Sequence, residues 1–351
     1  MKRTTRRTVC VLALISLLTI AVPLGFSQTD SELKNYLSQK MGLSQDQIAS
    51  IRSGQPFAKT LDSRTPAEIY VFGVVYINAA PESYVKFASD FNRLRQVPGY
   101  LAIKGFSEPP QPSDLQGFAF GSEDVKGLKD CKSGDCVVQL PASTMEQLRQ
   151  SVNWSAANVD DEVNQFVQKL ALSRVLQYQK QGNRILGAVY NDKDQQVNVA
   201  DQFKYMLSYS KVLPQDLPEL YNYLLEYPAA KPTNVENSFY WDNVKFGLKP
   251  TLRIVHVMTM HGATPQQPAY VIAEKQLYSS HYFETALDLA FCIRSEDPKE
   301  TGFYLVRVMG SEQAGLTGFK GSIVRKVAVG RSVSGLQNSL ASIKSTLEHR
   351  Q

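Results

Sequence analysis

The stretch EIYVFGVVYINAAPESYVKFASDFNRL, residues Glu68–Leu94, changes from a strand pattern to a helix pattern within four residues. β-Branched and aromatic side chains occupy both alternating sides up to Asn78, which predicts a strand that is covered on both faces. Pro81 stands where a first helical turn tolerates proline, and apolar residues then recur at helical spacing from Tyr84 onward. We therefore expect a buried strand and a helix that folds back across it.

Strand patterns return after residue 238, in three runs at 238–261, 269–294 and 302–311. The loops between them are rich in Gly, Pro, Thr and Asp, which favours an antiparallel meander. The chain then closes with a helical pattern whose apolar positions step by 4, 3, 4, 3 and 4, namely Val329, Val333, Leu336, Leu340, Ile343 and Leu347. This stripe predicts a long helix that packs on the rest of the protein.

Between these parts the pattern is mostly helical. Residues 159–182 predict a long helix that stops at Gly182, and two more helical stretches follow at 198–209 and 215–226 before a proline-marked linker. Nearer the N-terminus we expect a helical lead-in through Gly54 followed by a turn-rich stretch, and strands at 99–106 and 135–141. The residues Ser143–Glu146 form a capping-box motif and predict a helix start.

Five parts of the chain carry a resemblance to a known family: the strand, the turn Ala79-Ala80-Pro81-Glu82, the helix through Asp90, the meander and the final helix from about Ile323. Together they resemble the START-like, helix-grip (SRPBCC-type) superfamily, which includes lipid-transfer and aromatase/cyclase proteins. The resemblance implies an α+β fold, an antiparallel curved sheet gripped by a long C-terminal helix, with an apolar molecule held in a cavity between sheet and helices. It does not imply catalysis. We expect a signal peptide at 1–27, a helical lead-in at 28–65, the first half of the START-like domain at 66–157, a mostly helical insertion at 158–232 and the second half at 233–351.

The first 27 residues have the pattern of an export signal. Lys2, Arg3, Arg6 and Arg7 precede an apolar run, and cleavage is expected after Ser27. The arginine pair leaves Sec and twin-arginine export open, and an uncleaved anchor is the alternative to cleavage. We expect a periplasmic or extracellular protein of a bacterium. Cleavage removes four of the 38 basic residues and none of the 33 acidic ones, so the net charge falls from +5 to +1 and no nucleic-acid partner is expected.

Cys131 and Cys136 flank a Ser-Gly turn, and in an exported chain this spacing favours a disulfide. Two free thiols, or redox or metal chemistry, are the alternatives. Cys292 is interpreted as an inert strand residue. The sequence predicts neither a metal site nor a cofactor.

The candidate ligand-binding residues lie in the β-rich half. His256 shares a strand face with apolar residues, so it is either a hydrogen-bonded core histidine or a residue that orients a ligand. Tyr278, Tyr282 and Glu284 alternate with His281 along what we interpret as one strand, which is either the polar part of an apolar pocket or a solvated sheet face. Because strand side chains alternate, His281 and Glu284 point to the same side only if a bulge intervenes.

Three hypotheses for function follow. The first is an exported module that binds a hydrophobic or amphipathic small molecule, such as a lipid, with peripheral membrane contact as a further expectation. The second is an enzyme of the same fold acting through His281, Glu284 or His256, although none of the motifs GxSxG, GxGxxG, HExxH or the Walker loop occurs. The third is a protein-interaction module without a ligand cavity.

Overall fold

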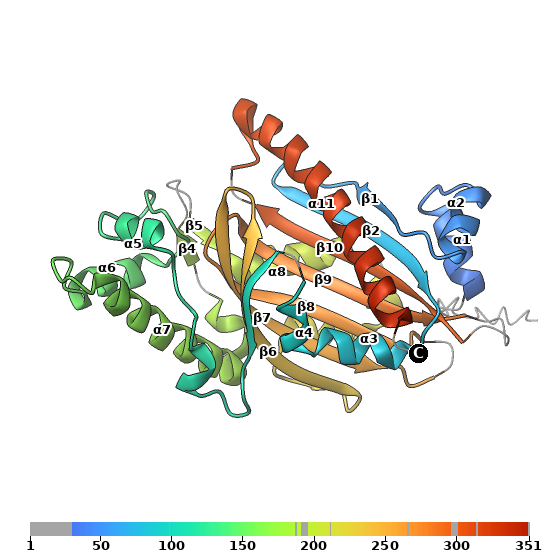
Figure 1. Cartoon of the computed structure of the whole chain (residues 1–351), viewed down its shortest axis with the longest axis horizontal. Helices are drawn as coiled ribbons and strands as arrows, with labels where there is room; N and C mark the ends of the chain where they lie inside the picture. Colours follow the sequence, from blue (N-terminus) through green and yellow to red (C-terminus); the bar gives the residue numbers. More distant parts are fainter. Residues whose placement is uncertain are drawn as a thin grey trace, which may run out of the picture.

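An eight-stranded antiparallel sheet, in the order β1-β2-β10-β9-β8-β7-β6-β3, organises the computed structural model (Figure 1). The structure describes residues 30–97, 99–186, 188–190, 196–210, 212–264, 267–295, 301–313 and 315–349, so the predicted signal peptide lies outside it. The strands of the sheet are β1 Phe57–Leu61, β2 Glu68–Ile77, β3 Tyr100–Gly105, β6 Val235–Phe246, β7 Lys249–His261, β8 Tyr270–Ser279, β9 Phe283–Arg294 and β10 Phe303–Gln313. A separate small hairpin pairs β4 Ala188–Tyr190 with β5 Gln196–Asn198.

Helices cover both faces of the sheet. They are α1 Asp30–Gln39, α2 Gln45–Arg52, α3 Pro81–Ala88, α4 Phe91–Leu94, α5 Ser122–Leu128, α6 Ala142–Ser151, α7 Val159–Gln181, α8 Val199–Tyr209, α9 Val212–Asp216, α10 Pro218–Glu226 and α11 Gly318–Glu348, with short 3₁₀ turns at Pro112–Leu115 and Gly182–Ile185. The fold class is therefore the expected one, α+β with an antiparallel sheet and a long C-terminal helix. In the part of the chain that the structure describes, no helix is long and apolar enough to cross a membrane.

The two faces have separate cores. On the α7 face, Phe72 and Val74 of β2 belong to a cluster with residues of α1, α2 and α5 to α10. On the α11 face, Val71 and Val75 of β2 belong to a cluster with residues of α3 and α11. Every residue of β2 is buried, which confirms the prediction that this strand is covered on both sides.

The strand-to-helix junction also forms as predicted, with Pro81 in the first turn of α3. The helix is shorter than expected, because it ends at Ala88 and a second helix, α4, starts at Phe91. The Ser89 hydroxyl donates a hydrogen bond to the Val85 carbonyl, and the Asp90 carboxylate caps the amide of Arg93. These two local side-chain bonds compete with helix continuation.

The antiparallel meander and the closing helix are confirmed. The meander has five strands, β6 to β10, rather than three runs, since turns divide the first two runs. Helix α11 begins at Gly318, ahead of the predicted Ile323, and buries four residues of the predicted stripe, Leu336, Leu340, Ile343 and Leu347.

Three local predictions were wrong. The turn-rich stretch after Gly54 contains strand β1, which pairs with β2. Residues 135–141 form no strand, because the disulfide between Cys131 and Cys136 closes a tight loop there. Helix α6 starts after Pro141 without a side-chain cap, so the proposed capping-box residues Ser143 and Glu146 lie inside the helix. The disulfide itself is present as predicted, and Cys292 is a buried free thiol.

Candidate functional site

The predicted polar strand around residue 281 is not one strand. Strand β8 ends at Ser279 and β9 begins at Phe283, so His281 and Tyr282 occupy the turn between them. Tyr282 adopts a φ of 62°, which is unusual for a residue other than glycine. Its hydroxyl accepts hydrogen bonds from the amides of Leu248 and Lys249 in the β6–β7 turn, at 3.0 and 2.9 Å. Tyr282 therefore ties two neighbouring turns at one end of the sheet.

His281 and Glu284 both contact helices of the α7 face. His281 Nε2 lies 2.8 Å from Asp124 Oδ2 on α5. A register shift leaves Glu284 without a partner position on β10, and its carboxylate accepts a hydrogen bond from Gln202 of α8 at 2.7 Å. The register shift is the irregularity that would let His281 and Glu284 point to the same side of the sheet. Both side chains bind groups of the protein, Asp124 and Gln202.

Tyr278 follows a bulge between β7 and β8 and packs in the core of the α7 face. Burial raises the pKa of its hydroxyl, and burial lowers the pKa of the neighbouring Arg174 guanidinium on α7. Within the described residues, neither the Tyr278 hydroxyl nor Arg174 Nε has a hydrogen-bond partner. These two groups therefore leave unpaired polar atoms between β8 and α7.

His256 is a fully buried core histidine. Its Nε2 lies 2.9 Å from Asn237 Oδ1 and its Nδ1 lies 3.3 Å from the Tyr178 hydroxyl. Its ring stacks on Phe239, with centroids 4.5 Å apart. Burial, and then the charge of Lys275, lower the pKa of His256 well below its ordinary value. The ring nitrogens therefore serve protein hydrogen bonds, and His256 lies apart from the turn that holds His281.

Lys275, which the sequence analysis did not single out, faces His256 directly across the β7–β8 pair. It is fully buried. Its Nζ donates a hydrogen bond to Asn183 and lies 3.8 Å from the centroid of the Phe203 ring. No carboxylate of the described residues forms an ion pair with it, and burial lowers its pKa well below the ordinary value.

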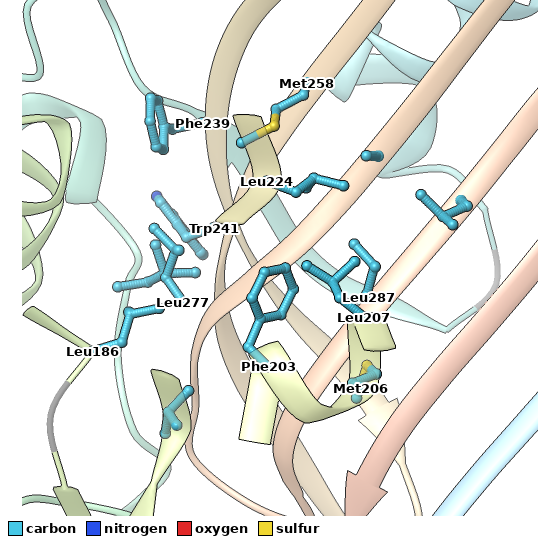
Figure 2. Packing of buried hydrophobic residues seen from close by; sticks show 14 of the residues in the cluster. Leu186, Phe203, Met206, Leu207, Leu224, Phe239, Trp241, Met258, Leu277 and Leu287 are labelled. Atoms are coloured by element: carbon cyan, nitrogen blue, oxygen red, sulfur yellow. The ribbon is translucent and has the colours of Figure 1, made fainter. Parts of the chain in front are cut away.

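Figure 2 shows the apolar packing on this face, where Phe203 lies near Leu207 and Leu287. Leu277 lies in a neighbouring group with Trp241 and Leu186. Lys275 alternates along β8 with Ala273 and Leu277, both of which lie in this core. A lysine at an apolar position of a strand is the signal by which the sequence could have identified it.

The α11 face carries a different polar group, which we call the polar floor. It consists of six side chains from five neighbouring strands: Asp242 (β6), Arg253 (β7), Glu274 and Gln276 (β8), Asp288 (β9) and Arg307 (β10). The strand register brings them together although they are spread over 66 positions of sequence, from 242 to 307. None of them was predicted as a site residue.

Two ion pairs form the ends of the polar floor. Arg253 binds both carboxylate oxygens of Asp242, at 2.9 and 2.5 Å, and Arg307 binds Asp288. Glu274 stands directly opposite Asp288 on the neighbouring strand. The side chains of Arg253, Arg307 and Asp288 keep 23%, 15% and 15% exposure, so solvent reaches the polar floor.

The carboxylates of the polar floor resist ionisation. Burial, and then the charge of Asp288, raise the pKa of Glu274 to about 7, against the opposing effect of Arg307 and Arg253. Burial also raises the pKa of Asp288 and Asp242, and their arginine partners oppose it. Near neutral pH the polar floor therefore holds two arginines, two paired aspartates and a glutamic acid that is partly protonated.

Tyrosines approach the polar floor from the elements above it and beside it. Burial raises the pKa of Tyr84 on α3, and the charges of Arg307, Glu274 and Asp288 act on its hydroxyl. Burial likewise raises the pKa of Tyr100 on β3, on which the charges of Asp242 and Glu274 act. These neutral hydroxyls add hydrogen-bonding groups to an otherwise ionic surface.

Three buried atoms of the polar floor have no hydrogen-bond partner among the described residues: Asp288 Oδ1, Arg307 Nε and Gln276 Oε1. Buried polar atoms in native proteins are almost always paired, with protein or with ordered water. One donor and two acceptors are thus available to a polar group that enters from the α11 side.

The space directly under α11 is filled where the helix crosses β2. A Cβ on Gly73 would come within 2.8 Å of the side chains of both Leu336 and Leu340. A surface groove of about 590 Å³ lies farther along, between the N-terminal half of α11 and the β1–β2 edge. The Arg325 guanidinium that lines it already donates to the carbonyls of Pro66 and Glu68. Among the described residues, no group of three or more His, Cys, Asp or Glu side chains is arranged to hold a metal ion.

Comparisons with known proteins leave the family open. No family model matches the sequence, and no curated protein matches it. Among solved structures, the di-domain ARO/CYC StfQ from the steffimycin biosynthetic pathway is similar over 87% of this chain and 94% of that chain, with 13% sequence identity and a TM-score of 0.23. At this TM-score the likeness carries no argument about fold or function.

Proposed function

We propose that this protein is a binding module for a neutral, amphipathic small molecule, whose polar part rests on the polar floor. The observation that carries the proposal is the set of unpaired buried atoms on Asp288, Arg307 and Gln276. A molecule with hydroxyl or amide groups offers both a donor and an acceptor, and so would complete the hydrogen bonds of all three. The proposal keeps the expected ligand-binding role and moves it from residues 278–284 to the opposite face of the sheet.

The charges of the polar floor favour a neutral ligand over an ion. Each arginine is already paired with an aspartate, so no full positive charge is left for an anion. The partly protonated Glu274 would lose its proton beside a cation, at the cost of placing a further negative charge opposite Asp288. Tyr84 and Phe87 on α3 belong to the apolar core on the same side of the sheet.

The test compares the wild-type protein with a double variant, Asp288→Asn with Arg307→Gln, which removes both charges together and leaves no unpaired ion. The matched control, Glu123→Gln with Lys126→Gln, removes an exposed ion pair of 3.1 Å. Native mass spectrometry first identifies any molecule that copurifies. Calorimetric titration then measures the binding affinity of three test ligands: a long-chain alcohol, a monoacylglycerol and a hydroxylated polycyclic aromatic.

We expect the wild type and the control to bind at least one neutral amphiphile. The double variant should bind it about tenfold more weakly or worse, because hydrogen bonds at positions 288 and 307 are then no longer made to charged groups, a difference of about 1 kcal/mol each. Equal binding by the wild type and the double variant would place the ligand elsewhere. If no member of the panel binds and nothing copurifies, the binding-module proposal fails.

A further inference from the structure

The N-terminal half of α11 presents apolar side chains to solvent. Phe319, Ile323, Val324 and Val327 are 86%, 60%, 52% and 51% exposed. Single exposed apolar residues are ordinary, but four of them within nine positions of one helix form a patch that marks an interaction surface. In Figure 1 the first turns of α11 extend beyond the strand ends, so this patch stands at an end of the molecule.

The inner side of the same helix is fixed to the sheet. Arg325 donates hydrogen bonds to the carbonyls of Pro66 and Glu68 and to the Ser63 hydroxyl. Val329, one turn later on the same side, packs against the core of the α11 face. At about 100° per residue, Phe319, Ile323 and Val327 lie on the other side of the helix. The helix therefore cannot rotate to bury them without breaking the Arg325 contacts.

The exposed side is also cationic. Lys320, Lys326 and Arg331 are exposed beside the apolar residues. From Gly318 the helix contains no acidic residue until Glu348. We call the four apolar residues and these three basic ones the amphipathic face of α11. A helix with apolar and basic residues on its exposed side has the composition of helices that lie in a membrane interface.

We propose that the amphipathic face of α11 docks on the surface of a bilayer that contains anionic lipid. Charge complementarity selects this occupant over two others. The segment 1–27 carries four basic residues and no acidic one, so it would repel the face. A second copy of the chain would bring the same cations against themselves. This inference stands apart from the ligand proposal, because it shares no residue with the polar floor.

The test uses the full chain and sedimentation with vesicles of phosphatidylcholine alone, or of phosphatidylcholine and phosphatidylglycerol in equal parts. One triple variant changes the apolar residues Phe319, Ile323 and Val327 to Gln. A second changes Lys320, Lys326 and Arg331 to Gln. Since every variant keeps residues 1–27, any vesicle binding by that apolar segment is common to all of them.

Two matched controls remove comparable groups elsewhere on the surface. Lys126→Gln, Lys129→Gln and Lys132→Gln together remove three exposed positive charges from the region of α5. Leu101→Gln removes an apolar side chain on β3 that is 55% exposed. Circular dichroism and thermal unfolding of each variant show whether the protein is folded before binding is compared.

We expect the wild type and both controls to bind vesicles that contain phosphatidylglycerol, with weaker binding as salt is added. Removing the three basic residues should weaken binding about 100-fold, since each contributes about fivefold near an anionic surface. Removing the apolar residues should also weaken it, by at least tenfold. The proposal is overturned if folded variants bind as the wild type does, or if wild type binds no vesicle. It is also overturned if the variants abolish a dimer of the chain rather than vesicle binding.

Discussion

Glu274→Gln tests the electrostatics of the polar floor by a change of stability with pH. Glu274 has a pKa of about 7 in the folded protein, because it is buried and faces Asp288, against about 4.5 when unfolded. The folded state therefore holds the proton over a pH range where the unfolded state has released it. Ionising Glu274 costs stability, so the free energy of unfolding falls as pH rises from about 4.5 through about 7.

At about 1.4 kcal/mol per pKa unit, the whole effect is about 3 kcal/mol, and most of it falls between about pH 5 and about pH 8. Glutamine has the same shape and cannot ionise. We expect Glu274→Gln to have about wild-type stability near pH 5 and to exceed the wild type by about 2 kcal/mol near pH 8. The other polar-floor carboxylates are present in both proteins, so most of their contribution cancels in the difference.

The measurement is urea denaturation of both proteins, followed by fluorescence, at several pH values. Glu123→Gln is the control, because that glutamate lies on α5 with 86% exposure of its side chain and its ion-pair partner is a lysine. Its curve should follow the wild type from about pH 5 to about pH 8. A difference between Glu274→Gln and wild type that stays constant from about pH 5 to about pH 8 would show that Glu274 ionises normally, and the description of the polar floor as partly protonated would be wrong.

Three further predictions concern stability. Lys275→Met should raise the melting temperature at neutral pH, because the unfolded chain regains a charge that the buried amine has lost; the gain should shrink as pH approaches about 10, and a gain independent of pH would contradict the lowered pKa. Leu340→Ala should cost about 2 to 5 kcal/mol, since the side chain is fully buried under α11, whereas an equally small loss for Leu340→Ala and for Leu101→Ala on the exposed side of β3 would show that the helix stripe packs on little. Replacing Cys131 and Cys136 by Ser should cost about 2 kcal/mol in denaturation under oxidising conditions and nothing under reducing ones. Among Cys131, Cys136 and Cys292, intact mass with thiol labelling should find only Cys292 as a hindered free thiol, and labelling of Cys131 and Cys136 in unfolded, non-reduced protein would exclude the disulfide.

The sequence predicted those parts of the fold that local patterns determine. Strand β2, the proline start of α3, the stop of α7 at Gly182 and the stripe of α11 each depend on neighbouring residues. The turn at His281 and Tyr282 was missed because it contains no Gly, Pro or Asn. Its unusual backbone is held by two hydrogen bonds to the Tyr282 hydroxyl, from the amides of Leu248 and Lys249, more than thirty positions away.

The polar floor was missed for a related reason. Arg253, Asp288 and Arg307 each stand between two apolar residues, and one strand at a time this pattern indicates a solvated sheet face. Only the register of five strands shows that Asp242 meets Arg253 and that Glu274 meets Asp288. Charged side chains become a candidate site when they are adjacent, and adjacency between strands is a tertiary property.

Strand β8 illustrates why we propose the ligand on the α11 face rather than beside Lys275 on the α7 face. Glu274 and Lys275 are neighbours in sequence and point to opposite faces, and burial drives both toward their neutral forms. The amine of Lys275 is already satisfied within the protein, since it donates a hydrogen bond to Asn183 and is covered by the Phe203 ring. Glu274 lies among side chains that keep some exposure and leave a donor and two acceptors unpaired. A ligand could add hydrogen bonds to the unpaired atoms around Glu274, whereas the amine of Lys275 is already bonded within the protein.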